Sequence, residues 1–380
     1  MRRSSRTRTT ARARRTVARH LGLAAAVATA GAAAAADLQV VSWGGAYEAA
    51  QRDAVVAPFA ATTDLEVEML RYDGTTADLA ARAKAEGWDV VDMLADRARV
   101  ACEAGLLAEL DAAALLGEAA LADFAPAAPD RCAIPQNVYA RVAAYDARAF
   151  PGVKPTRIED FFDVARFPGP RAVQRSPDGI LEWALLAEGV PPAQIYGLLS
   201  TDRGLRLALR RLEAIRGEVI WWTDPGEPAR LLAEGEAVMA AGFNGRFFDA
   251  AEETGAPITI LWDGRIIGVE VWAVPADADD PEAARRFLAH AARPESMARF
   301  AERIPYGPAR RSAFARIGRR PGTGTPMRPH LPNAPGREGR ALMRDGVWYA
   351  NTAPLRARRF EDWLAGEADP GGQAGAAPRD

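Results

Sequence analysis

The chain has 380 residues, with 48 lysines and arginines against 50 acidic residues, two cysteines and three histidines. Eight of the arginines and none of the acids lie in residues 1–36, so residues 37–380 carry 40 basic and 50 acidic side chains, a formal charge of −10. This acidic balance disfavours nucleic acid or an anionic membrane surface as a partner, and it is compatible with a cationic ligand.

Residues 1–36 have the composition of an export signal. Their arginines precede a run of small apolar residues that ends in three alanines at 34–36, which is typical of a cleaved signal. The pair Arg14-Arg15 suits the twin-arginine export route, while the general secretory route stays open. The apolar stretch over 21–36 is shorter than the ~20 residues that a spanning helix needs. We therefore expect a soluble exported protein.

Both cysteines, Cys102 and Cys132, follow this signal. Export places them in an oxidising compartment, where an even number of cysteines usually pairs. We expect a Cys102–Cys132 disulfide, and two unrelated buried thiols are the alternative. The 344 residues after position 36 exceed one ordinary hydrophobic core, so we expect two lobes.

The first part of the exported sequence alternates strands with helices. Apolar runs predict strands, and apolar residues at helical spacing predict helices. The expected strands are 38–42, 65–70 and 88–94, and the expected helices are 47–61 and 75–86. This alternation predicts a mostly parallel sheet with helices on its faces.

The second part continues with different boundaries. A capping box from Thr156 to Glu159 is expected to begin a short helical segment. The Gly-, Ala- and Pro-rich residues 367–380 are expected to be disordered. Further expected strands are 172–174, 219–222, 237–243, 258–262 and 268–274, and further expected helices are 181–188, 202–216, 229–234 and 281–292.

Histidine chemistry is scarce after the signal. Only His290 and His330 remain, on an expected helix and in a Pro-rich loop, so neither a metal cluster nor a His-dependent triad is easily built. The chain has no Walker-type loop, no G-x-S-x-G and no Rossmann glycine pattern, and the pair Gly44-Gly45 alone is too weak a signal. We expect no catalytic residue, no metal and no cofactor.

Aromatic and acidic side chains stand at the ends of strands, where open α/β sheets place their ligands. Trp43 follows the first strand, and Asp96 follows the third. Glu270 lies in the apolar run GVEVWAVP, where a charge needs a partner or a ligand. An ammonium group over an aromatic face gains roughly 0.5–2 kcal/mol, and a nearby carboxylate adds charge pairing. These residues predict a site for an amine.

Each candidate also has a purely structural interpretation. Asp96 is equally expected as the cap of the helix that follows it, and Glu182 as a first-turn acid favoured by the helix dipole. Asn244 fits a turn. Trp221 and Trp222 are neighbours on one strand, so their side chains point to opposite faces and one of them leaves the core that the other joins.

A series of motifs carries a family resemblance. In chain order they are SWGGAY, WDVVDM, EDFFD with FPGPR, LEWALLAEGV, LLAEGEAVMAAGFNGR, and VWAVP followed by IPYGPARR. Together they resemble the periplasmic substrate-binding proteins of spermidine/putrescine-type ABC transporters. The resemblance implies an α/β, two-lobed periplasmic binding protein fold that closes by a hinge over a ligand cleft between the lobes. The implied parts are the export signal 1–36, lobe 1 over 37–142, lobe 2 over 143–265, the return to lobe 1 with C-terminal helices over 266–366, and the tail 367–380.

The resemblance implies that a periplasmic monomer captures a small cationic ligand, a polyamine such as putrescine or spermidine, and delivers it to an ABC permease in the inner membrane. Glu270 matches the acid that grips an amine in this family, and Tyr306 matches a rim aromatic. Phe243 stands where spermidine-binding members have a tryptophan. Tyr47 is expected to pack rather than to contact ligand. The expected ligand-binding residues are Trp43, Asp96, Tyr139, Glu182, Trp221, Asn244, Glu270 and Tyr306.

Two alternatives stay open. One is another small solute, such as an amino-acid derivative or an opine-like compound, and Arg246 is the candidate that would favour a carboxylate if it faces the cleft. The other is a secreted hydrolase that uses Asp96 and Glu182 as a carboxylate pair.

Overall fold

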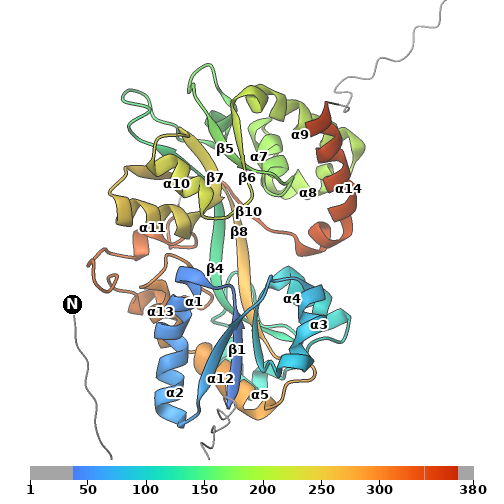
Figure 1. Ribbon diagram of the computed structural model, residues 1–380, viewed down its shortest axis with the longest axis vertical. Helices are drawn as coiled ribbons and strands as arrows, with labels where there is room; N and C mark the ends of the chain where they lie inside the picture. The colour runs from blue at the N-terminus through green and yellow to red at the C-terminus, as the bar shows by residue number, and fades with distance from the viewer. Residues whose placement is uncertain (1–36, 338, 367–380) are drawn as a thin grey trace, which may run out of the picture. The chain divides into compact units, whose positions relative to one another are not determined.

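The computed structural model describes residues 37–337 and 339–366, so the expected export signal and disordered tail lie outside the described residues. One sheet carries the strands in the order β2-β1-β3-β8-β4-β7-β5-β6, with β10 beside β8 and β9 beside β4 (Figure 1). The strands are β1 (Leu38–Ser42), β2 (Val67–Arg71), β3 (Val90–Leu94), β4 (Ala133–Asp146), β5 (Arg171–Gln174), β6 (Val219–Trp222), β7 (Met239–Phe243), β8 (Ile258–Ala273), β9 (Gly307–Pro308) and β10 (Ala341–Met343).

Helices cover the sheet on both faces (Figure 1). We call the part around β1, β2 and β3 the first lobe and the part around β5, β6 and β7 the second lobe. The first-lobe helices are α1 (Gly45–Gln51), α2 (Ala57–Thr63), α3 (Thr76–Glu86), α4 (Ala95–Glu103), α5 (Ala112–Leu116), α6 (Glu118–Leu121), α12 (Pro281–Ala291) and α13 (Pro294–Ala301). The second-lobe helices are α7 (Ile180–Ala187), α8 (Ile195–Leu199), α9 (Asp202–Leu212), α10 (Glu227–Ala233) and α11 (Asn244–Thr254), and α14 (Gly346–Ala365) packs beside α9.

The first lobe confirms the predicted order of strands and helices. β1 pairs in parallel with both β2 and β3. The predicted helix over 47–61 is a longer rod, because α1 continues through a π-helical turn at Arg52–Val56 into α2. Thr75 caps α3 by accepting a hydrogen bond from the Asp78 N–H at 3.0 Å, as its sequence predicts.

The two long strands β4 and β8 connect the lobes. They run antiparallel, and β8 also pairs with β3 of the first lobe while β4 pairs with β7 of the second. The sheet is therefore parallel among β1, β2 and β3 and among β5, β6 and β7, while β4 and β8 pair antiparallel with each other and with β7 and β3, and β10 alone pairs in parallel with β8 among the described strands. The predicted strands 258–262 and 268–274 are one strand, whose register against β4 shifts between Leu261 and Ile266. The apolar pattern of the sequence is interrupted at this irregularity, so it predicted two strands where the structure has one.

One predicted cap in the second lobe is wrong in its residue. The Asp160 carboxylate, rather than that of Glu159, accepts from the Thr156 and Arg157 N–H groups, at 2.7 and 3.0 Å. The segment that follows is a short 3₁₀ helix at Ile158–Phe162. This helix begins one residue later than predicted, with Arg157 as its N-cap, so the acid three residues further on that reaches back is Asp160.

The C-terminal helix α14 belongs to the second-lobe core. Its buried aromatic residues pack in one cluster with apolar residues of α7, α8 and α9; they are Trp348, Tyr349, Phe360 and Trp363. The chain thus reaches the second lobe twice, once between β4 and β8 and again after β10. The lobe boundaries given above stay predictions, and this second crossing lies inside the range 266–366 that was expected to return to lobe 1.

Cys102 at the end of α4 and Cys132 just before β4 form the predicted disulfide. It joins two segments of the first lobe that are 30 residues apart in sequence. Within the described residues, no helix has both the length and the apolar character needed to cross a bilayer.

Candidate binding site

A cavity of about 510 Å³ lies where the two lobes face each other. The first lobe contributes Trp43 and Tyr47 to its lining, the second lobe contributes Phe243 and Arg246, and β8 contributes Glu270 between them. This is the place at which a cleft between the lobes was expected.

Trp43 forms an aromatic wall at the end of β1. Gly44 and Gly45, which begin α1, have φ angles of 79° and 63°, a conformation that other residues rarely adopt. The Trp43 ring lies 5.5 Å from that of Tyr72, centroid to centroid. Gly74 makes room for it, because a Cβ there would lie 2.0 Å from the indole. Trp43 is thereby held with its ring on the cavity, as the sequence predicts.

Glu270 lies deepest among the acids of the cavity and is 8% exposed. The Tyr47 hydroxyl and the Asn137 amide both donate to Glu270 Oε2, the amide at 3.3 Å. Asn137 is directly opposite Glu270 in the β4–β8 pairing. Burial raises the pKa of Glu270 to about 7, against the opposing effect of these two hydrogen bonds. Tyr47 packs against Phe300 and Tyr306, as expected, and it also lines the cavity and holds this acid, which the sequence did not predict.

A set of buried polar side chains continues behind Glu270, between α1 and the sheet. Gln51 donates to Asp92 Oδ2 at 2.6 Å and to Gln136 Oε1 at 3.1 Å, and it accepts from the Ser42 hydroxyl at 2.5 Å. Burial and the neighbouring Glu270 raise the pKa of Asp92. We call this set the polar layer; its members are Ser42, Tyr47, Gln51, Asp92, Gln136, Asn137 and Glu270.

Three further aromatic rings border the same cavity. The Tyr139 ring lies 5.9 Å from Phe243 and 6.5 Å from Tyr306, and Tyr306 lies 5.7 Å from Tyr47. Burial raises the pKa of Tyr139 to about 12, so its phenol is neutral at physiological pH. Tyr139 and Tyr306 thus lie in the cavity lining, where sequence placed them, and Phe243 joins them.

Four arginines also line the cavity, and they differ in their partners. Arg344 is paired with Asp96 at 2.9 Å. Arg141 donates to Gln174 Oε1 at 2.7 Å and lies over the Phe243 ring, and Arg97 donates to the Gly74 carbonyl. Arg246 borders the cavity from the start of α11. Among the described residues, Arg97, Arg141 and Arg246 form no ion pair with an acid, so they are available to an anionic group.

Two of the four acids that line the cavity are paired with arginines. Asp249 is paired with Arg320 at 2.8 Å, and Asp178 is paired with Arg356. Asp73, at the exposed rim, accepts from the Thr75 N–H at 2.7 Å. Glu270 is therefore the buried acid of the cavity that forms no ion pair among the described residues. The site combines one buried carboxyl group, an aromatic wall and several unpaired guanidinium groups.

The structure does not bring two predicted acids into this cavity. Asp96 is turned to Arg344 and borders a neighbouring hollow instead. Glu182 is fully buried, accepts from the Gly179 N–H at 3.0 Å at the start of its own helix, and accepts from the Tyr349 hydroxyl. Glu182 therefore has the structural role that the sequence offered as an alternative, that of an acid in the first turn of its helix. The two side chains have other partners and do not form an exposed carboxylate pair.

Two other predicted residues are also outside the cavity lining. Trp221 packs against Phe360 and Trp363 of α14, with ring centroids 5.8 and 6.2 Å apart, while Trp222 points into the other face. Asn244 is fully buried, accepts from the Ala140 N–H at 2.9 Å, and donates to the Pro305 carbonyl. α14 covers Trp221. The hydrogen bonds of the Asn244 amide join β4, α11 and the segment before β9.

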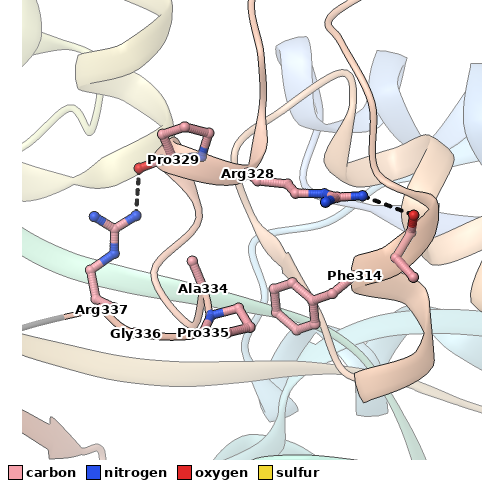
Figure 2. Close-up of a pocket in the computed structure, with 8 residues that line it drawn as sticks. Phe314, Arg328, Pro329, Ala334, Pro335, Gly336 and Arg337 are labelled. Atoms are coloured by element: carbon pink, nitrogen blue, oxygen red, sulfur yellow. Dashed lines mark hydrogen bonds between the residues drawn. The ribbon is translucent and has the colours of Figure 1, made fainter.

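A second hollow, lined by residues between Phe314 and Arg337, contains two arginines but has a different character (Figure 2). Arg328 donates to the Ala315 carbonyl at 2.8 Å, and Arg337 donates to the Leu331 carbonyl at 2.8 Å. Arg337 also lies over the Trp262 ring. These guanidinium groups are already used to hold loops together, so this hollow offers less to a ligand than the cavity between the lobes.

Sequence reasoning missed several residues of the cavity lining, among them Tyr47 and the arginines Arg97, Arg141 and Arg344. Arg141 had a signal of the same kind as Glu270, because it is a charge within the long apolar run of β4. Asp92 had the same signal, because it is a charge within the apolar run WDVVDML. Arg97 and Tyr47 had none, because a lone arginine or tyrosine on an amphipathic helix is ordinary surface or packing.

A family profile described as bacterial extracellular solute-binding protein matches residues 54–323. The chain belongs to that family. Its members are substrate-binding proteins and not enzymes, which agrees with the absence of catalytic motifs and excludes the hydrolase alternative. The two-lobed α/β fold expected from sequence is confirmed. The polyamine-specific branch of the predicted resemblance is not supported by the named relatives.

Those relatives are similar along nearly the whole chain. The gamma-aminobutyric acid-binding protein of Pseudomonas aeruginosa is 32% identical over 342 residues, which cover 90% of this chain and 94% of the relative. An ABC transporter substrate-binding protein from Bradyrhizobium japonicum is 28% identical with a TM-score of 0.75, covering 86% of this solute-binding protein and 99% of that structure. The solved structure of a GABA receptor is 26% identical with a TM-score of 0.73, covering 88% and 99%.

Proposed function

We propose that this solute-binding protein captures a small amino-acid derivative with an ammonium group at one end and a carboxylate at the other, of the type of gamma-aminobutyric acid (GABA), and delivers it to an ABC permease. It acts in the periplasm as a monomer. The proposal follows the alternative of an amino-acid derivative rather than the polyamine. The observation that carries it is the pairing of one unneutralised buried acid with unpaired arginines in a single cavity.

The charges around the cavity distinguish these two ligand classes. Glu270, with the rings of Trp43 and Tyr306 nearby, suits an ammonium group. Arg141 and Arg246 suit a carboxylate, because a guanidinium group binds a carboxylate with short, charge-assisted hydrogen bonds. The second ammonium group of a diamine would meet unpaired arginines, and two like charges about 4 Å apart repel by about 4 kcal/mol at an effective dielectric constant near 20.

The relatives support the same choice. The curated relative at 32% identity is named for gamma-aminobutyric acid, and a structure with the same fold is named as a GABA receptor. Delivery to a permease is supported by the similar protein from Bradyrhizobium, which is named as part of an ABC transporter. In this family of folds, binding by the two lobes would be coupled to their closure, and a ligand favours the closed form only through contacts that the open form lacks.

GABA and putrescine form a matched pair of ligands for the test. They have the same number of carbon atoms and differ at one end, where GABA has a carboxylate and putrescine an ammonium group. We expect the melting temperature of the exported chain to rise with GABA concentration, as it does for a ligand that binds only the native state, and to stay constant with putrescine. A rise with putrescine and none with GABA, or with other amino-acid derivatives, would restore the polyamine.

A further inference from the structure

The polar layer behind the cavity contains two buried carboxyl groups without a cation. Asp92 is fully buried and Glu270 is 8% exposed. They lie on neighbouring strands, where Leu94 is paired with Glu270 and Asp92 is two residues earlier. Side chains two residues apart on a strand point to the same face, so both acids face the same layer. Asn137, which is opposite Glu270 on β4, extends this row to a third strand.

The helix above the row supplies only neutral groups. Tyr47 and Gln51 lie four residues apart on α1 and so share one helix face. The Tyr47 hydroxyl donates to Glu270, and the Gln51 amide donates to Asp92 at 2.6 Å. Ionised carboxylates buried without a positive partner cost several kcal/mol each. The contacts of the layer are therefore those of a protonated or partly protonated pair.

Asp92 shows a second sign of a bound proton. Its Oδ1 atom is buried and has no hydrogen-bond partner among the described residues, and the same is true of Asn137 Oδ1 in the same layer. An ionised carboxylate in this position would lose its hydration and gain only hydrogen bonds from neutral groups, because Tyr47, Gln51 and Trp43 oppose the effect of burial on the Asp92 pKa without supplying a positive charge. A neutral carboxyl group tolerates the position better, because it carries no charge that has to be removed from water.

The titratable and charged groups around this pair do not change that conclusion. Tyr72 on the segment after β2, Tyr139 on β4 and Tyr306 before β9 are phenols whose pKa is raised by burial, so they stay neutral. The pKa of Tyr47 on α1 is raised by burial and by both acids. The charged side chains on the other surrounding elements are Arg97 and Asp96 on α4, Arg141 on β4, Arg246 and Asp249 on α11, Arg344 after β10 and Asp73 after β2, and none forms an ion pair with either carboxyl group in the described chain.

We propose that the polar layer stores the proton which ligand capture displaces: Asp92 stays a neutral acid and acts as a positioning residue, and Glu270 gives up its proton when the ammonium group of the ligand binds. No bond of the ligand breaks, and the proton leaves to the solvent. Asp92 holds Gln51 in place. Because Asp92 stays neutral, it does not compete for the ammonium group, and the negative charge of the layer forms on Glu270, beside the ligand. The inference rests on the proposed function in one respect, namely that the ligand carries an ammonium group.

The first test needs no ligand. A carboxyl group whose pKa is higher in the folded than in the unfolded protein stabilises the fold at low pH, and this stabilisation is lost as the pH rises from its unfolded value near 4 through its folded value. Asp92→Asn removes one such group. Between pH 5 and 8, we expect the melting temperature of the wild type to fall more than that of Asp92→Asn, by about 3 °C.

Glu68→Gln is the matched control, since Glu68 is an exposed acid on the neighbouring strand β2. Its variant is expected to follow the wild-type pH dependence. Equal slopes for the wild type and Asp92→Asn would overturn the proposal, because they would mean that Asp92 is ionised in the folded protein. If Asp92→Asn does not fold, carboxyl carbon NMR of the labelled wild type reads the same protonation directly.

The second test follows the displaced proton with GABA as the probe. Neither end group of free GABA titrates between pH 5.5 and 8, so a change in that range belongs to the protein. Titration calorimetry at pH 6 in two buffers of different ionisation enthalpy is expected to show release of most of one proton per ligand bound. The affinity is expected to fall by up to tenfold for each pH unit below 7, where Glu270 titrates.

The outcomes of the two tests separate the two proposals. Binding of GABA with the same affinity at pH 5.5 and 8, and with no difference between buffers, would overturn the proton displacement and leave the proposed function standing. No binding of GABA or of other amino-acid derivatives would remove the proposed function, and the melting curves would still decide whether Asp92 and Glu270 hold protons.

Discussion

Arg246 is the side chain that separates the two ligand classes most directly. It lines the cavity and forms no ion pair within the described chain, whereas the nearby Asp249 is already held by Arg320. Sequence placed Arg246 as a candidate for recognising a carboxylate, and the structure puts it on the lining. Its contribution is accordingly expected to depend on which ligand is bound.

Replacing Arg246 with alanine tests this directly. A hydrogen bond to a charged group contributes roughly 1.5–3 kcal/mol, and Arg246 is exposed, so we expect the lower end: a loss of about tenfold in GABA affinity by calorimetry. Arg99→Ala is the control, because Arg99 is exposed on α4, pairs with Glu103, and lies outside the cavity lining. GABA affinity that is equal in both variants would argue against a carboxylate contact at Arg246.

Trp221 illustrates a residue whose type fits a binding site and whose surroundings do not. It faces Phe360 and Trp363 of α14 rather than the cavity. We expect Trp221→Ala to lower the free energy of unfolding by about 3 kcal/mol, as truncation of a packed aromatic side chain usually does, and to leave GABA affinity within a factor of about two. Urea unfolding and calorimetry measure the two effects. Weaker binding at unchanged stability would return Trp221 to the site.

At the scale of the elements, the sequence was informative where signals were local. β1, α3 and β6 appear at or within one residue of their predicted bounds, because each has an apolar run or cap that is decided within a few residues. The union of 258–262 and 268–274 into β8 was not predictable in this way. It depends on pairing with β4, which is more than a hundred residues earlier in the chain.

The residues of the candidate site also differ in whether their signal is local in the sequence. Trp43 and Glu270 were found because each contrasts with its immediate sequence: an aromatic beside two glycines, and an acid in an apolar strand. The contact between Tyr47 and Glu270 joins residues 223 apart and follows from the docking of α1 on the sheet. The helix α14 that covers Trp221 follows it in the chain by more than a hundred residues. Such long-range packing, and not residue type, separated the four predicted residues in the cavity lining from the four outside it.

At the scale of the whole molecule, the lobes are joined by more than the two long strands. Asp96 on α4 of the first lobe pairs with Arg344, which precedes α14, and α14 packs into the second-lobe core. If the lobes close on the ligand, this ion pair lies between parts of the protein that move relative to each other. We expect the radius of gyration measured by X-ray scattering to decrease when GABA is added to the exported chain. The same value with and without ligand, under conditions where calorimetry shows binding, would contradict closure.

The second crossing of the chain, through β10 into α14, has a practical consequence. Leu38 is buried in the first-lobe core, while Trp363, near the other end of the described chain, is buried in the second-lobe core. Two dyes attached just outside these points would sit on different lobes, although neither would touch the cavity. If the lobes close on the solute, energy transfer between the dyes would report its concentration, as in a fluorescent sensor, without alteration of any residue of the candidate site.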